Sequence, residues 1–232
     1  MTRITAALFD KDGTLFDFHA TWSAWCRKII LAEAGDDPVL AGRLAYKLGY
    51  DLETGAFSSD SIVIGHTTGE VAEAILPLLP DTDFASLMQR LNQAGVAAPQ
   101  APATDLVALV AALRARDLRI GVATNDSEAP ARAHLSQAGV GEAFDFIAGY
   151  DSGYGGKPAP GQLLAFAQAF DIDPKNCIMV GDSLHDLHAA QAAGMIPVAV
   201  LTGIATADVL APHAAVVLPS VADLPAWIDT QA

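Results

Sequence analysis

Two hydrophobic patterns alternate along most of the chain. Short apolar runs that end at polar residues predict buried strands at 4–9, 118–123, 145–149, 177–180, 197–201 and 214–218. Between these runs, apolar residues mostly recur at helical spacing. Repeated strand–helix units with nearly all-apolar strands favour a parallel sheet that is covered on both faces, and right-handed crossovers make it doubly wound. We therefore predict an α/β fold.

A long segment after the first strand departs from this pattern. Helical spacing at roughly 22–35, 39–48, 68–76 and 84–94 continues without a strand, and the Pro/Ala-rich stretch 95–102 looks like a linker. Glu70 is placed to support a helix cap at Thr67 or Thr68, and Thr104 is expected to cap the helix that runs to Arg116. We therefore predict an α-helical unit, 17–98, inserted into a core of residues 1–16 and 99–232.

Polar residues follow four of the predicted strands at the end where parallel sheets bind ligands. They are Asp10 and Asp12, then Thr124, then Lys157 in its Gly-rich loop, then Asp182 and Asp186. Alternate strand positions share a face, so the first two carboxylates are expected to point the same way. Carboxylates that converge repel one another unless a cation lies between them, and Mg²⁺ prefers such oxygen ligands.

Each of these residues also has an ordinary structural interpretation. The first motif could be a strand and a polar turn, Thr124 a helix boundary, and Lys157 a solvated lysine. Asp182 and Asp186 could be acids that favour a helix N-terminus. Together, however, they divide the work of a reaction: one carboxylate attacks, another transfers a proton, others hold a metal, and a hydroxyl and an ammonium bind an anion.

The composition limits which binding partners and which cellular compartment are expected. The 232 residues include 13 basic and 27 acidic ones, a formal charge of −14, which disfavours nucleic acid and anionic membranes as partners. Any phosphate site must therefore carry its own local cations. Cys26 and Cys177 lie too far apart in the sequence to suggest a disulfide framework or a metal-binding motif. No apolar stretch is long enough to span a bilayer. Arg3 leads directly into a strand and not into the apolar core of a signal peptide. We expect a cytoplasmic protein.

The segments 9–15, 124–125, 156–160 and 181–186 resemble the motifs of the haloacid dehalogenase superfamily, in the order of that family. Within it they resemble the phosphoglycolate phosphatase-like branch, whose inserted helical cap matches 17–98 in position and type. The resemblance implies a Mg²⁺-dependent phosphatase that hydrolyses a small phosphate monoester, such as 2-phosphoglycolate, through an aspartyl-phosphate. The implied partner is a small phosphorylated metabolite, and the implied assembly is a monomer or homodimer.

The resemblance also implies roles for individual residues. Asp10 would be the nucleophile, and Asp12 would protonate the leaving oxygen, then activate water, with its backbone carbonyl touching Mg²⁺. Thr124 and Lys157 would hold the phosphoryl oxygens. The implied metal ligands are Asp10, Asp12, Asp182 and Asp186, and the matched motifs place Gly13, Thr14 and Asn125 at the substrate.

Lys11 departs from the family pattern, because many relatives carry an apolar residue there. On a strand it would point away from Asp10 and Asp12, so we expect it to reach solvent or a neighbouring acid.

Substrate choice is expected to lie in the cap. The candidates are Arg43, Lys47 and His66, although Arg43 and Lys47, four apart on one helical face, could equally form a solvated surface. A transition-metal site at His185 and His188 is disfavoured because hard oxygen ligands surround it in the sequence. Two other functions remain open: a phosphosugar mutase that uses the same core, and a non-enzymatic phosphorylated receiver module.

Overall fold

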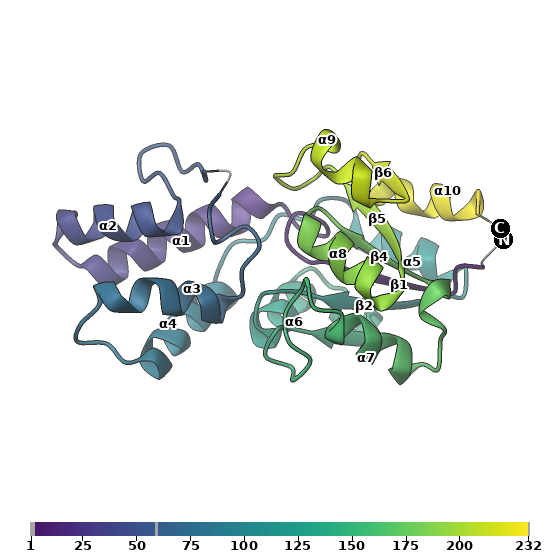
Figure 1. Cartoon of the computed structure of the whole chain (residues 1–232), viewed down its shortest axis with the longest axis horizontal. Helices are drawn as coiled ribbons and strands as arrows, with labels where there is room; N and C mark the ends of the chain where they lie inside the picture. Colours follow the sequence, from purple (N-terminus) through teal and green to yellow (C-terminus); the bar gives the residue numbers. More distant parts are fainter. Residues whose placement is uncertain (1–2, 59, 232) are drawn as a thin grey trace.

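The computed structural model describes residues 3–58 and 60–231. Residues 1, 2, 59 and 232, which our predicted segments include, lie outside the described residues. Figure 1 shows two lobes, one built of helices and the other around a sheet. In the part of the chain that is described, no helix is long and apolar enough to cross a membrane.

The sheet has six parallel strands in the order β3-β2-β1-β4-β5-β6. They are β1 (Ala6–Phe9), β2 (Arg119–Ala123), β3 (Phe146–Ala148), β4 (Cys177–Gly181), β5 (Ile196–Val200) and β6 (Val216–Leu218). The prediction of a doubly wound α/β fold is confirmed. Strand β1 is central, and the strand order reverses beside it, which is where sheets of this kind leave a crevice for ligands.

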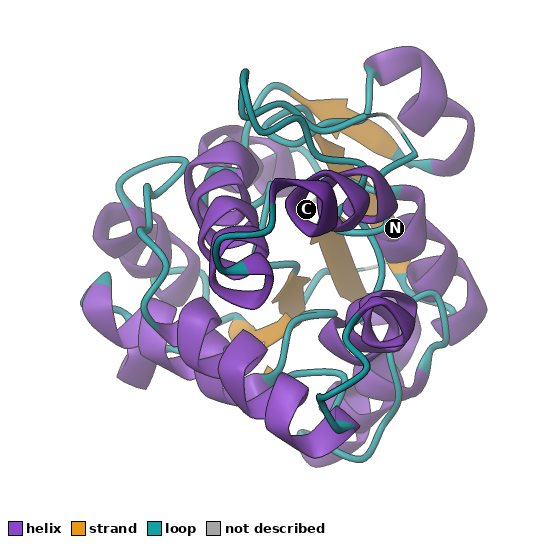
Figure 2. Cartoon of the chain, turned by 90° about the vertical axis from the view of Figure 1, so that its left-hand side faces the viewer, coloured by secondary structure: helices purple, strands orange, loops and turns teal. Residues whose placement is uncertain are grey.

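Helices cover both faces of the sheet, because successive strand residues point to opposite sides. Ala7 and Phe9 pack with α5 (Leu106–Arg114), α6 (Glu128–Gln137) and α10 (Leu224–Asp229). Ala6 and Leu8 pack with α7 (Gly161–Ala169) and α8 (Leu184–Ala193). The short helix α9 (Ala207–Leu210) joins a small cluster beside β5. Figure 2 shows helices surrounding the strands.

Local capping explains several helix boundaries. Asp105, rather than the predicted Thr104, caps α5, since its carboxylate accepts from the amide of Ala108 at 3.0 Å. A carboxylate one residue later serves the same orphan amides of the first turn. Short 3₁₀ helices lie at Leu76–Leu78, Gly141–Ala143, Pro174–Asn176, Ala211–His213 and Val221–Asp223.

In its described residues, the segment between β1 and α5 contains no strand and, besides the 3₁₀ helix Leu76–Leu78, four α-helices. They are α1 (Phe18–Ala34), α2 (Pro38–Leu48), α3 (Thr68–Ile75) and α4 (Phe84–Val96). They share a separate hydrophobic cluster that includes Trp25, Leu44, Ile75 and Leu87. The predicted cap between Thr67 and Glu70 is present at the start of α3 as a capping box. We keep residues 17–98 as our proposed cap and the remainder as our proposed core.

The chain passes between the core and the cap twice, and the two connecting segments run side by side. The amide of Asp17 donates to the carbonyl of Ala101 at 2.8 Å, and the amide of Ala103 donates to the carbonyl of Leu15 at 2.9 Å. Leu15 follows β1 closely in the chain. These bonds therefore hold both connecting segments near the carboxyl end of β1.

Candidate active site

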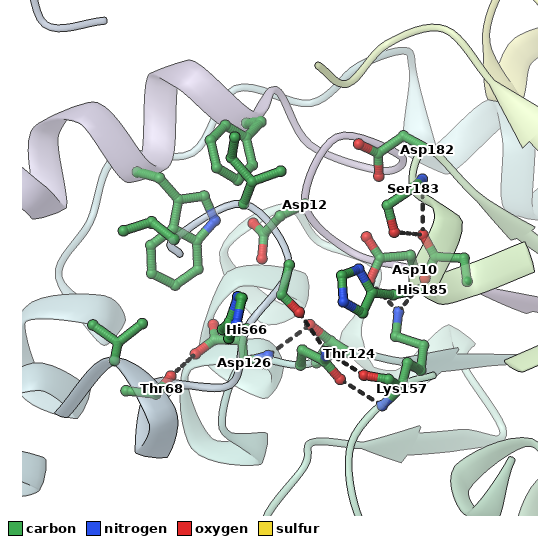
Figure 3. Close-up of a pocket in the computed structure, with 18 of the residues that line it drawn as sticks. Asp10, Asp12, His66, Thr68, Thr124, Asp126, Lys157, Asp182, Ser183 and His185 are labelled. Atoms are coloured by element: carbon green, nitrogen blue, oxygen red, sulfur yellow. Dashed lines mark hydrogen bonds and ion pairs between the residues drawn. The ribbon is translucent and has the colours of Figure 1, made fainter. Parts of the chain in front are cut away.

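A pocket of about 50 Å³ lies between the carboxyl ends of the central strands and the cap (Figure 3). The cap contributes aromatic and aliphatic side chains to its wall, including Phe18, Trp22 and Val63. Because parallel strands end at one edge of the sheet, residues far apart in the sequence meet here. The predicted residues that line it are Asp10, Asp12, His66, Thr124, Asn125, Lys157, Asp182 and Asp186.

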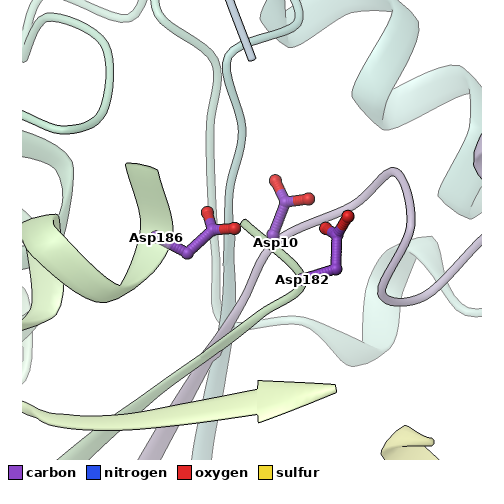
Figure 4. A group of neighbouring side chains, drawn as sticks. All are labelled: Asp10, Asp182 and Asp186. Atoms are coloured by element: carbon purple, nitrogen blue, oxygen red, sulfur yellow. The ribbon is translucent and has the colours of Figure 1, made fainter. Parts of the chain in front are cut away.

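Three carboxylates converge at the base of this pocket (Figure 4). Asp10 follows β1, Asp182 follows β4, and Asp186 lies in the first turn of α8. Each offers one oxygen within 4.8 Å of the others. The Lys157 ammonium lies 2.6 Å from Asp10 Oδ1 and 2.5 Å from Asp186 Oδ1, and all four side chains are buried.

The electrostatic balance of this group is negative. Burial raises the pKa of Asp10 to about 7, although Lys157 opposes the shift and Asp186 adds to it. Burial, with Asp10 and Asp186 nearby, raises the pKa of Asp182 well above its ordinary value. Burial opposes the charged form of Lys157, but Asp10 and Asp186 outweigh it and raise its pKa. One buried ammonium therefore does not compensate three buried carboxylates.

Glycines make room for the Asp182 carboxylate. A Cβ on Gly13 would lie 2.4 Å from Asp182 Oδ2, and a Cβ on Gly203 would lie 1.7 Å from it. Gly13 also has a φ of +84°, which favours glycine. Thr14 donates to Asp182 Oδ1 at 3.4 Å. Gly13 and Thr14 thus lie against this carboxylate and are not among the pocket-lining residues.

The residues present fit a divalent, oxygen-seeking cation. Asp10, Asp182 and Asp186 supply hard carboxylate oxygens in one place. The raised pKa values of Asp10 and Asp182 indicate that their charged forms need a further positive partner. Mg²⁺ prefers such a site, with its remaining positions filled by water and phosphate oxygens. Asp12 is expected to touch the metal through its backbone carbonyl, and its carboxylate is not part of the three-acid group.

Lys11 does not behave as the strand pattern predicts. Its side chain is fully buried and turns back to Asp12, with Nζ 2.8 Å from Oδ1 and 2.7 Å from Oδ2. It also reaches a neighbouring acid, Asp126, at 3.2 Å. The expectation that it points away from Asp12 is wrong, because β1 ends at Phe9 and strand alternation does not continue through the turn.

Asn125 joins three segments beside the pocket. Its Nδ2 donates to the carbonyls of Gly65 at 2.8 Å and Lys157 at 2.9 Å, and its Oδ1 accepts from the Lys157 amide at 2.8 Å. Thr124 is buried beside it, and its hydroxyl oxygen accepts from the amide of Asp126 at 3.0 Å. These bonds fix the loops that carry Thr124 and Lys157.

Two histidines face the pocket from opposite sides. His66 comes from the cap and His185 from α8, with ring centroids 6.3 Å apart. Burial lowers the pKa of His185, with Asp186 opposing the shift. From the sequence, His185 stands out only as a possible transition-metal ligand, because nothing in the sequence places the cap loop over α8.

Arg43 and Lys47 lie elsewhere. They line a separate hollow on the surface of α2, together with Val39, Tyr46 and Leu78. The structure does not bring either of them to the pocket that holds the carboxylates. Helical spacing placed them correctly on one face of α2, but it could not tell which face of that helix looks toward the core.

Comparison with known proteins agrees with this arrangement. The sequence model of the haloacid dehalogenase-like hydrolase family matches residues 4–194 of this chain. A phosphoglycolate phosphatase of Rhodospirillum rubrum is 37% identical over 123 residues, 53% of this chain and 51% of that protein. The fructose-1-phosphate phosphatase YqaB of Escherichia coli is 28% identical over 196 residues, 83% of this chain and 94% of that protein.

A solved structure shares the fold across both lobes. The crystal structure of a predicted phosphoglycolate phosphatase from Haemophilus somnus 129pt matches with a TM-score of 0.73, at 19% identity and over 97% of each chain. The match to the Rhodospirillum protein spans only about half of its length. The family model, in contrast, covers most of this chain. The chain therefore belongs to the haloacid dehalogenase-like hydrolase family.

Proposed function

We propose that the protein is a Mg²⁺-dependent phosphatase that hydrolyses a small phosphate monoester. The observation that carries the proposal is the grouping of Asp10, Asp182 and Asp186 around the Lys157 ammonium, with Asp12 on the same pocket wall. The names of the Rhodospirillum and Escherichia relatives, both phosphatases, support it. Phosphoryl transfer needs positioning and neutralisation of spread negative charge, which suits this set of groups.

In the first step, a carboxylate oxygen of Asp10 attacks the phosphorus atom. The bond to the ester oxygen breaks, and Asp12 delivers a proton to the leaving oxygen. In the second step, water attacks the aspartyl-phosphate, Asp12 takes the proton of that water, and the bond to Asp10 breaks. Lys157 and Thr124 hold the phosphoryl oxygens throughout. When bound by Asp10, Asp182 and Asp186, Mg²⁺ supplies positive charge that neutralises the phosphoryl group.

We further propose that the leaving group is compact, as in 2-phosphoglycolate. The pocket of about 50 Å³ is small, and its cap side is largely aromatic and aliphatic, which suits a leaving group with few polar atoms. His66 from the cap and His185 from α8 are two imidazoles that line the same pocket. We assign them the polar end of the substrate. Arg43 and Lys47 have no part in this proposal, since they do not line the pocket.

The test is release of inorganic phosphate from a panel of esters, with Mg²⁺ and with a chelator. The panel contains 2-phosphoglycolate, sugar phosphates and nucleotides. Asp10→Asn should reduce turnover by at least about 10⁴-fold while the protein remains folded, because a carboxamide cannot form the acyl phosphate. Asp36→Asn, at an exposed cap position, is the matched control.

Three outcomes would contradict the proposal. Activity retained in Asp10→Asn excludes the covalent route. An isomerised sugar phosphate in place of free phosphate indicates a mutase. A stable phosphoprotein without multiple turnover indicates a receiver module.

A further inference from the structure

The Lys11 ammonium lies at the centre of a second buried group in the core, which we call the Lys11 cluster: Lys11, Asp12, Asp126 and His134. This ammonium hydrogen-bonds to Asp12 and His134 and forms an ion pair with Asp126. Its Nζ lies 2.7 Å from Asp12 Oδ2, 3.0 Å from His134 Nδ1 and 3.2 Å from Asp126 Oδ2. Lys11 and His134 are fully buried. The motif-based roles give Asp12 a function but leave Lys11, Asp126 and His134 without one.

His134 fixes the direction of these bonds. Its Nε2 lies 2.7 Å from the carbonyl of Gly95, which can only accept, so Nε2 carries the hydrogen. Nδ1 is then the free acceptor and faces the Lys11 ammonium. Burial, with Lys11 nearby, lowers the pKa of His134 to about 4, which agrees with a neutral ring.

The cap closes the Lys11 cluster on several sides. Gly95 belongs to α4, and its carbonyl holds His134. The Trp22 ring of α1 lies 5.7 Å from the Lys11 ammonium, within range of a cation–π contact. The Thr68 hydroxyl of α3 donates to Asp126 Oδ1 at 3.4 Å. Three cap helices thus contact the groups that surround this ammonium.

Among the described residues, Lys11 makes the only side-chain ion pair of Asp12, and it contacts both carboxylate oxygens. Asp12 lines the reaction pocket, and Lys11 does not. We propose that Lys11 is a positioning residue, whose ammonium, held by His134 and the cap, directs the Asp12 carboxylate for proton transfer. This inference rests on the phosphatase function proposed above, in which Asp12 serves the leaving oxygen.

A positioning role predicts a dependence on the leaving group. An alkyl ester expels a strongly basic oxygen and needs a proton from Asp12, whereas p-nitrophenolate leaves readily without one. A misdirected acid should therefore slow the alkyl ester selectively. For Lys11→Met, we expect kcat/KM to fall about 100-fold for 2-phosphoglycolate and less than about 5-fold for p-nitrophenyl phosphate. A merely structural defect would lower both values together.

The experiment compares these two esters in wild type, Lys11→Met and the exposed control Lys28→Met, with fructose 1-phosphate as the alkyl ester if 2-phosphoglycolate is turned over too slowly. Because Lys11→Met leaves two buried acids without their cation, Lys11→Met/Asp126→Asn is measured in parallel and decides the test if the single variant does not fold. A selective loss on the alkyl ester supports the inference. Equal losses, or none, overturn it. If wild type releases phosphate from none of the three esters, the phosphatase proposal fails instead.

Discussion

His134 makes two hydrogen bonds that only a neutral imidazole can make together. Its ordinary pKa is 6.5, and burial and Lys11 lower it to about 4 in the folded protein. Between these values the unfolded chain binds the extra proton, so the folded state loses stability as the pH falls. From pH 7 to pH 5 we expect a loss of about 2 kcal/mol in the free energy of unfolding from this residue alone.

His134→Asn tests this directly. Asn offers an acceptor near the position of Nδ1 and does not titrate, so the contribution of His134 to the pH slope should disappear. Urea unfolding between pH 5 and pH 7 measures the slope in wild type and variant. His188→Asn, at an exposed position of α8, should keep the wild-type slope. An unchanged slope in His134→Asn would contradict the assignment of a neutral, titration-resistant ring to His134 in the folded protein.

Asn125 acts at the meeting point of three loops. It bonds the cap loop through Gly65 and the loop that carries Lys157 through both the amide and the carbonyl of that lysine. Removing its side chain frees these loops without touching any proposed metal ligand. For Asn125→Ala we expect kcat/KM to fall by about 10- to 100-fold, because small displacements of a positioned group slow phosphoryl transfer strongly.

The control for Asn125→Ala is Asn92→Ala. Asn92 accepts a hydrogen bond from the Ser127 hydroxyl at 2.9 Å and so joins α4 to the start of α6, but it does not bond the Lys157 loop. If both variants lose activity equally, loosening of the cap explains the effect and Asn125 has no special part in placing Lys157. Steady-state kinetics, with kcat and KM reported separately, distinguish these cases.

The strand ends were predictable because two simple rules act together. Apolar runs identify buried parallel strands, and ligands collect at their carboxyl ends, so Asp10, Thr124 and Asp182 were expected at one edge before any contact was known. The helical insert was equally predictable, since its apolar spacing and the Thr67–Glu70 cap are local signals. Local sequence therefore specifies most of the framework of this site.

Contacts that depend on side-chain reach or on distant backbone were not predictable. Lys11 has a long, flexible stem, so the alternation of strand faces could not say where its ammonium ends. Gly203 adjoins Asp182 only because the chain returns from β5 to the same edge, and no short motif marks it. Arg43 and Lys47 share a helix face, yet the orientation of α2 toward solvent depends on packing of the whole cap.

Because of the charge distribution of the entire protein, we expect metal binding to change its free energy of unfolding. The chain carries a formal charge of −14, and its three converging carboxylates are buried against a single ammonium. Without a metal, that arrangement opposes folding, because buried like charges repel and are poorly solvated. A bound divalent cation offsets the repulsion only in the folded state, so it shifts the unfolding equilibrium of the whole molecule.

Thermal unfolding with and without Mg²⁺ should reveal this coupling. At a Mg²⁺ concentration about 100 times the dissociation constant, linkage gives roughly 2.7 kcal/mol, and for a chain of this size that raises Tm by about 5–10 °C. Asp182→Asn removes one buried charge, so its metal-free Tm should exceed that of the metal-free wild type, and Mg²⁺ should raise it much less. Asp36→Asn should respond to Mg²⁺ as wild type does, because that carboxylate is exposed on the cap. If Asp182→Asn and wild type gained equally from Mg²⁺, the cation would be acting outside the three-acid group, and the proposed metal site would have to be abandoned.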